Sequence, residues 1–154
     1  MIELARIESA DALVVLSAKD MVALAAVLSP VSFASGQALV TQGRPSASVY
    51  LHLEGTLNVR REVADGLALQ GNIPRGEWFG VLSVLDGQDA TASVFALTDV
   101  EVAALGRADF DRLLQREDGL HPRLLRAWLR SLGMQLGRVN RGNEEILKLA
   151  ASLR

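Results

Sequence analysis

The spacing of hydrophobic residues changes twice along this 154-residue chain and divides it into three parts. In residues 1–30, Ser17-Ala18-Lys19-Asp20 has capping-box spacing and the apolar residues after it recur at helical intervals, which predicts a short amphipathic helix. In residues 31–105 the apolar segments become short or alternating and glycines separate them, a pattern typical of an antiparallel sandwich or roll. The helical period returns in residues 107–154. We therefore expect a single domain over residues 1–154, with N-terminal helices, a β-roll and C-terminal helices.

The clearest strands of the middle part are Val49–Leu53 and Thr56–Val59. Glu54-Gly55 lies between them as a turn, and a second turn at Ala64-Asp65-Gly66 precedes a further strand over residues 67–70. The two turns predict consecutive β-hairpins.

The last part contains two predicted helices. The first begins at Arg107–Phe110 and ends near Asp118-Gly119, and the second begins at Pro122, since proline suits a first helical turn. Along the second helix an apolar row steps by four and three residues alternately and includes one asparagine. The row comprises Leu125, Leu129, Leu132, Leu136, Val139, Asn143 and Ile146. Such heptad spacing is typical of a coiled-coil seam in which a lone asparagine fixes the register, so we expect a homodimer.

A second interpretation of this row stays open. The segment from Leu125 to Leu132 would pack onto the roll as one face of any docked helix does, without a partner chain. Gly133, Gly137 and Gly142 also weaken the helix, by roughly 1 kcal/mol each relative to alanine.

Composition and charge exclude several classes of site. The chain has no cysteine, which excludes disulfides, thiolate metal sites and cysteine nucleophiles. Charged residues interrupt the apolar runs near the N-terminus, so we expect neither a signal peptide nor membrane insertion. The absence of cysteine fits a reducing compartment, so we expect a cytoplasmic protein. The net charge of −2 hides an asymmetry, because from Pro122 onward there are seven basic residues against two acidic ones. A basic helix can meet an acidic partner, although exposed arginines are ordinarily just solvated.

The stretch from Gly76 to Val94 contains Gly76-Glu77-Trp78-Phe79-Gly80-Val81-Leu82-Ser83 and, further on, Ala90-Thr91-Ala92. It resembles the phosphate-binding cassette of the cyclic-nucleotide-binding domain family, which runs Gly-x-x-Phe-Gly-Glu-Leu-Ala/Ser and then Arg-Ala/Ser/Thr-Ala. Segments 31–43, 49–59 and 92–110 also resemble that family's hairpins, last strands and following helix. The resemblance extends from about Leu28 to Val139.

The resemblance implies an α+β fold, mainly β, in which helices flank an antiparallel double-stranded β-roll of jelly-roll type. It also implies a long C-terminal dimerisation helix, since that helix pairs with its twin in bacterial regulators. In regulators of the catabolite-activator type a helix-turn-helix domain follows this helix, whereas this sequence ends at Arg154. We therefore expect no direct sequence-specific DNA binding.

The family's ligands are cAMP and cGMP, and the resemblance also implies where they would bind. In the family, backbone N–H groups at a short helix start and an arginine hold the phosphate, and a glutamate accepts the ribose hydroxyl. The matching positions are Phe79, Gly80, Val81, Leu82, Ser83, Ala90, Thr91 and Ala92. Ser83 and Thr91 supply hydroxyl donors, but Val81 replaces the glutamate and Ala90 replaces the arginine.

Losing the partner of a buried charge costs about 3 to 5 kcal/mol, which lowers affinity by roughly two to three and a half decades. Arg75 is the nearest arginine in sequence that would replace the missing charge. The wall formed by Val81, Leu82 and Ala90 is suited instead to an uncharged or apolar small molecule, and the alternative is that these side chains fill the space and nothing binds.

Two functions from different classes are compatible with this sequence. The first is a stand-alone regulatory domain, a dimeric small-molecule sensor or signalling adaptor with weak or no cAMP or cGMP binding. The second is a degenerate module that binds no ligand and contacts a protein partner through its C-terminal helix.

The remaining candidate residues do not point to catalysis. His52 and His121 are isolated and make no metal site, and no hydrolase motif is present, so we do not expect an enzyme. Trp78 and Phe79 are expected in the core or as a lid. Trp128 is expected to pack the long helix against the roll, although relatives contact the base from its place.

Overall fold

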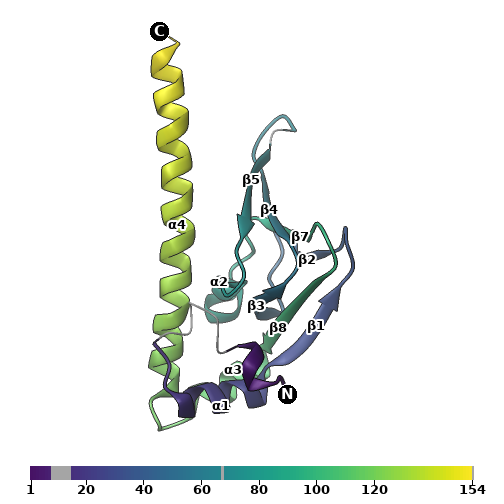
Figure 1. Cartoon of the computed structure of the whole chain (residues 1–154), viewed down its shortest axis with the longest axis vertical. Helices are drawn as coiled ribbons and strands as arrows, with labels where there is room; N and C mark the ends of the chain where they lie inside the picture. Colours follow the sequence, from purple (N-terminus) through teal and green to yellow (C-terminus); the bar gives the residue numbers. More distant parts are fainter. Residues whose placement is uncertain (8–14, 67, 154) are drawn as a thin grey trace.

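The β-roll consists of two four-stranded antiparallel sheets, as Figure 1 shows. The computed structural model describes residues 1–7, 15–66 and 68–153. In one sheet the order is β1 (Ser29–Phe33), β8 (Val100–Gly106), β3 (Ser48–Glu54) and β6 (Trp78–Phe79); in the other it is β2 (Ala38–Val40), β7 (Ser93–Ala96), β4 (Leu57–Glu62) and β5 (Ala68–Ile73). The helical elements are η1 (Leu4–Arg6), α1 (Ala18–Val27), α2 (Val81–Asp86), α3 (Arg107–Leu114) and α4 (Leu120–Ser152). The predicted α+β roll with flanking helices is therefore confirmed. Of the two predicted hairpins, the second is present because β4 pairs with β5, but the first is wrong because β3 and β4 lie in different sheets and the turn at Glu54-Gly55 crosses between them. Leu67, in the predicted strand 67–70, lies outside the described residues.

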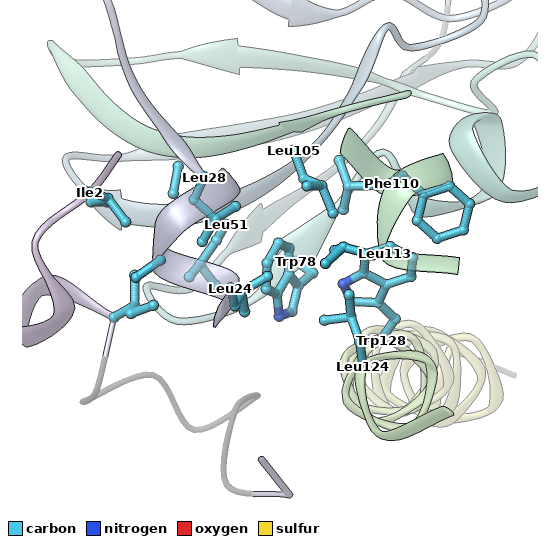
Figure 2. Packing of buried hydrophobic residues seen from close by; sticks show 14 of the residues in the cluster. Ile2, Leu24, Leu28, Leu51, Trp78, Leu105, Phe110, Leu113, Leu124 and Trp128 are labelled. Carbon is cyan, nitrogen blue, oxygen red and sulfur yellow. The ribbon is translucent and has the colours of Figure 1, made fainter. Parts of the chain in front are cut away.

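Strand β3 is buried on both faces of its sheet. Successive side chains of a strand point to opposite faces, so Val49 and Leu51 pack in the cluster that includes the helices, while Tyr50 packs in the cluster that joins the two sheets. Figure 2 shows the first cluster, in which Trp78 of β6 lies beside Trp128 of α4. One continuous layer of strands thus separates two hydrophobic cores.

A capping box starts α1, as its sequence predicts. The Ser17 hydroxyl accepts from the Asp20 backbone N–H at 3.2 Å, and the Ser17 N–H donates to Asp20 Oδ2 at 2.9 Å. Arg123 of α4 then donates to both oxygens of the same carboxylate, from Nε at 2.7 Å and from Nη2 at 2.6 Å. Asp20 therefore caps one helix and anchors another.

The long C-terminal helix α4 begins at Leu120, two residues before its predicted start at Pro122. Gly119 precedes it with φ of +78°, a left-handed conformation that turns the chain out of the preceding segment. Figure 1 shows α4 running beside the roll and ending beyond the β4–β5 hairpin. Among the described residues no helix combines the length and the apolar character that a membrane crossing requires.

Candidate ligand-binding site

The cassette turns sharply between β6 and α2 because Gly80 adopts a left-handed conformation, with φ of +77°. A Cβ atom at this position would lie 2.7 Å from the backbone oxygen of Ser48 on β3 and 3.1 Å from Ser46 Oγ. Glycine is therefore required both by the backbone angle and by the close approach of a neighbouring strand.

A cavity of about 160 Å³ opens beside this turn. All eight residues that the cassette resemblance places at the site line it, and they come from β6, α2 and the segment that leads into β7. The wall is completed by Val40, Val59, Ile73, Asp89, Val94, Leu132 and Gln135. The structure thus brings together residues from both sheets, from the cassette and from α4.

Leu132 and Gln135 were not predicted as residues of the ligand site. Leu132 is a member of the predicted dimer seam, but it is half-buried and faces the cavity, and Gln135 follows it on the next turn of α4. Leu125 is likewise half-buried and packs against the first core. The alternative that this segment packs onto the roll is therefore right for Leu125 and Leu132.

The two replaced cassette positions carry no charge into the cavity. Val81 is only 2% exposed and belongs to the first core, and Ala90 is half-buried against the second. The backbone of Ala90 pairs with the β2–β3 loop, donating to the Arg44 oxygen at 2.8 Å and accepting from the Gly43 N–H at 2.9 Å. Both side chains therefore serve packing, and the loop that holds Ala90 is fixed by backbone hydrogen bonds.

No lysine or arginine of the described residues lines the cavity, and Asp89 is the charged side chain that does. Arg75, the expected substitute, is exposed in the turn after β5 and lies outside the lining. Arg44 lies nearer in space, through its backbone bond to Ala90, but its side chain is exposed and also lies outside the lining. The electrostatic character of the wall is neutral to acidic.

The hydroxyl of Ser83 is already engaged within the cassette. It donates to the Gln88 backbone oxygen at 2.7 Å, and Ser83 is buried. This bond closes the loop that follows α2. The oxygen of Ser83 keeps acceptor capacity toward the cavity, since a hydroxyl accepts as well as donates.

Three polar side chains of α4 hold the start of the cassette, and we call Ser131, Gln135 and Arg138 the α4 clasp. Ser131 Oγ accepts from the Trp78 N–H at 3.3 Å, and Gln135 Nε2 donates to the Trp78 oxygen at 2.8 Å. Arg138 donates to both carboxylate oxygens of Glu77, at 2.6 and 2.5 Å. Positions 131, 135 and 138 step by four and three, which places them on one helix face. That polar spacing is the sequence signal for the clasp.

The tryptophans belong to the core and lie outside the cavity lining. Trp78 and Trp128 are buried with ring centroids 5.9 Å apart, and Phe110 lies 5.5 Å from Trp128, as the labelled side chains of Figure 2 show. Trp128 therefore packs α4 against the roll, as predicted, and it does not take the base-contacting place. Phe79 does line the cavity and stacks on Tyr50 at 5.2 Å.

Both ring nitrogens of His52 face backbone carbonyls. Nδ1 lies 2.8 Å from the Ile73 oxygen, and Nε2 lies 3.2 Å from the Glu54 oxygen and 3.1 Å from the Gly55 oxygen. His121 packs on Phe110. Within the described residues no three metal-ligating side chains gather at one point. His52 thus ties the β3–β4 turn to β5.

Comparison with known proteins identifies the fold and the family. Residues 30–117 match the family model described as the cyclic nucleotide-binding domain. The cAMP-dependent protein kinase regulatory subunit of Aspergillus niger is 34% identical over 91 residues, which are 59% of this chain and 22% of that protein, so the chain matches about a fifth of its relative's length.

Two solved structures have the same architecture. A cyclic nucleotide-binding domain from Methylobacillus flagellatus superposes with a TM-score of 0.75 at 23% identity, over 86% of this chain and 74% of that one. The regulatory subunit of a cAMP-independent protein kinase A from Trypanosoma cruzi, bound to guanosine, superposes with a TM-score of 0.65 at 28% identity, over 72% and 40%. The cassette, the roll and the family match agree, and the chain belongs to the cyclic nucleotide-binding domain family.

Proposed function

We propose that this domain is a regulatory module that senses a small molecule in the cassette cavity and transmits its presence through α4. The observation that carries the proposal is a shared wall: Leu132 and Gln135 of α4 line the cavity, and Gln135 also belongs to the α4 clasp. A ligand that fills the cavity must therefore touch the helix that leaves the domain. Such contact can shift the equilibrium between docked and undocked α4.

The ligand of this sensor is not a tightly bound cyclic nucleotide. A cyclic phosphate in the cavity would lie near Ala90 without a counter-charge and near the carboxylate of Asp89. The loss of the partner costs about 3 to 5 kcal/mol, or roughly two to three and a half decades of affinity. The trypanosomal neighbour bound to guanosine supports this view, since guanosine carries no phosphate.

We also propose that α4 pairs with α4 of a second copy. Leu129, Leu136, Val139 and Ile146 are exposed along one face of the helix, which supports the predicted seam. Because Leu125 and Leu132 face the body, the pairing would rely on the part of the seam from Leu136 onward, where Asn143 would fix the register.

A protein-interaction module is the second candidate, and the same exposed apolar face favours it. Helix α4 is basic, with six Lys or Arg against two Glu, so an acidic helical partner would complement it. In this case the cavity would have no influence on α4.

Filling the cavity with a side chain separates the two candidates. We expect Ala90→Trp to accelerate amide hydrogen exchange over residues 131–138, because the indole would press on Leu132 and Gln135. Leu97→Trp is the matched control, since Leu97 is exposed and lies outside this cavity. Unchanged exchange in a folded Ala90→Trp protein would refute the sensor and favour the interaction module.

A further inference from the structure

The size of the cassette cavity restricts its occupant. Its volume of about 160 Å³ is close to that of an engineered protein cavity of roughly 150 Å³, which stays dry and binds benzene. A cyclic nucleotide combines a purine, a ribose and a phosphate and is several times larger than benzene. The cavity is partly open to solvent, so its lined volume accommodates one ring or two small fused rings, and a larger ligand would extend into water.

The walls restrict the polarity of the occupant. Val40, Val59, Ile73, Val94 and Leu132 have hydrocarbon side chains, and Val81 and Ala90 add further apolar side chains where the family carries charges. Burying a polar or charged ligand against such walls is unfavourable unless hydrogen bonds or counter-charges replace water. The walls therefore favour a ligand that is mostly hydrocarbon.

The charges around the cavity exclude both kinds of ion. An anion would find no lysine or arginine among the described lining residues and would face Asp89. Asp89 itself is exposed, so its carboxylate is screened by water and would not compensate the desolvation of a buried cation. Arg44, whose backbone pairs with Ala90, and Arg75, which precedes the cassette, are exposed and would each have to leave solvent to reach the cavity.

Two polar side chains shielded from bulk water, Ser83 and Gln135, can still orient a ligand, whereas Thr91, which also lines the cavity, is exposed. The Ser83 oxygen can accept a hydrogen bond while its hydrogen remains on the Gln88 carbonyl. The Gln135 amide uses one N–H on Trp78 and retains a second N–H. They suit a ring that bears one hydroxyl or one ring N–H.

From these four observations we infer that the cassette cavity binds an uncharged compound of one ring or two fused rings with a single hydrogen-bonding group. This inference rests on the proposed sensor function and specifies its ligand class. The replacement of the two family charges by Val81 and Ala90 has, on this view, converted a nucleotide-phosphate site into a site for a small neutral ring.

Indole and phenol are suitable probes of this ligand class, and cAMP serves as the comparison ligand. Titration of the full chain by calorimetry and by ligand-observed NMR should show saturable binding of at least one of the two, at lower concentration than cAMP. Ala90→Phe should weaken that binding at least tenfold by filling the cavity, while Leu97→Phe, on the exposed surface, should not. Leu132→Trp fills the cavity from α4 and gives the same expectation where Ala90→Phe fails to fold.

The reciprocal variant restores the family arginine. Ala90→Arg restores the counter-charge for a phosphate and removes apolar space, so the ratio of the Kd for cAMP to the Kd for the ring probe should fall by roughly a hundredfold or more. Any one of three results would overturn the inference. These are tighter binding of cAMP than of both probes to the native chain, no binding of either probe, and undiminished probe binding in both cavity-filling variants. The proposed sensor function is tested separately by amide exchange over residues 131–138, so cAMP binding that changes this exchange would refute the ligand class and leave the sensor standing.

Discussion

Arg138 of α4 donates from both terminal nitrogens to the two carboxylate oxygens of Glu77, a residue that is 5% exposed and directly precedes β6. The pair lies beside the α4 clasp bonds to Trp78, so it joins the helix to the strand that opens the cassette. A bidentate arginine–carboxylate pair fixes orientation as well as distance. Helix α4 is therefore held to the cassette at one defined position.

Replacing Arg138 by alanine should destabilise the domain. The change leaves the Glu77 carboxylate buried without a partner, and since Arg138 itself is about one third exposed we expect a loss of about 2 kcal/mol in the free energy of unfolding by urea. Arg141→Ala is the control, because Arg141 lies on the same helix and is exposed. Equal stability of the two variants would contradict a structural role for the pair.

Replacing Gly80 by alanine should be costly because of two effects. The left-handed backbone disfavours alanine by roughly 1 to 2 kcal/mol, and the new Cβ would meet the Ser48 carbonyl at 2.7 Å. Gly87 has a similar φ of +67° but open space around it, so Gly87→Ala should cost only the backbone term. Thermal unfolding of the two variants measures the difference in their stability. A Gly80→Ala protein as stable as Gly87→Ala would mean that β3 shifts to make room for the new Cβ.

The cassette positions can be named from the sequence because the segment resembles the family's motif, which occupies one short continuous stretch. Eight residues within fourteen positions are brought to one cavity by a strand end, a glycine turn and a short helix, all of which depend on near neighbours. The turn at Gly80 and the capping box at Ser17 are signals of the same local kind.

The contributions of α4 are not predictable in the same way. Gln135 reaches Trp78 across 57 positions of sequence, and Arg138 reaches Glu77 across 61. The heptad row does not show that Leu132 faces the cavity, since one apolar stripe serves either a partner helix or the body of the domain. The same long-range packing places Arg44 nearer than Arg75 to Ala90. Tertiary docking decides these contacts.

Acid should destabilise the domain partly through Asp20. The hydrogen bond from Arg123, supported by those from Ser17, lowers the pKa of the Asp20 carboxyl well below its usual range. Its folded pKa is depressed, so its stabilisation is present above the unfolded pKa of about 4 and is lost as the pH falls from there toward the folded pKa.

The variant Asp20→Asn should therefore be less stable than the native chain at pH 7, by about 2 kcal/mol, with the gap narrowing below about pH 4. Urea unfolding at several pH values measures the gap. The salt bridge between Arg6 and Glu101 also lowers the pKa of the Glu101 carboxyl and persists in both proteins, so it cancels in the comparison. A gap that is independent of pH would show that the carboxylate charge of Asp20 contributes nothing.

The proposed dimer makes a prediction that distinguishes a coiled-coil seam from nonspecific hydrophobic association. Leu136→Glu and Ile146→Glu should each convert the dimer to a monomer in light scattering, because a charge in an a/d row has no partner in a two-stranded coil. Leu149 is as exposed as Ile146, at 63%, but it lies three residues after Ile146 and is not a member of the heptad row. The Leu149→Glu variant should therefore remain dimeric. Dissociation by all three variants would indicate loose apolar association, and dissociation by none would place the pairing surface elsewhere. Neither Leu136 nor Ile146 lines the cavity, so the loss of pairing can be measured with the ligand site intact.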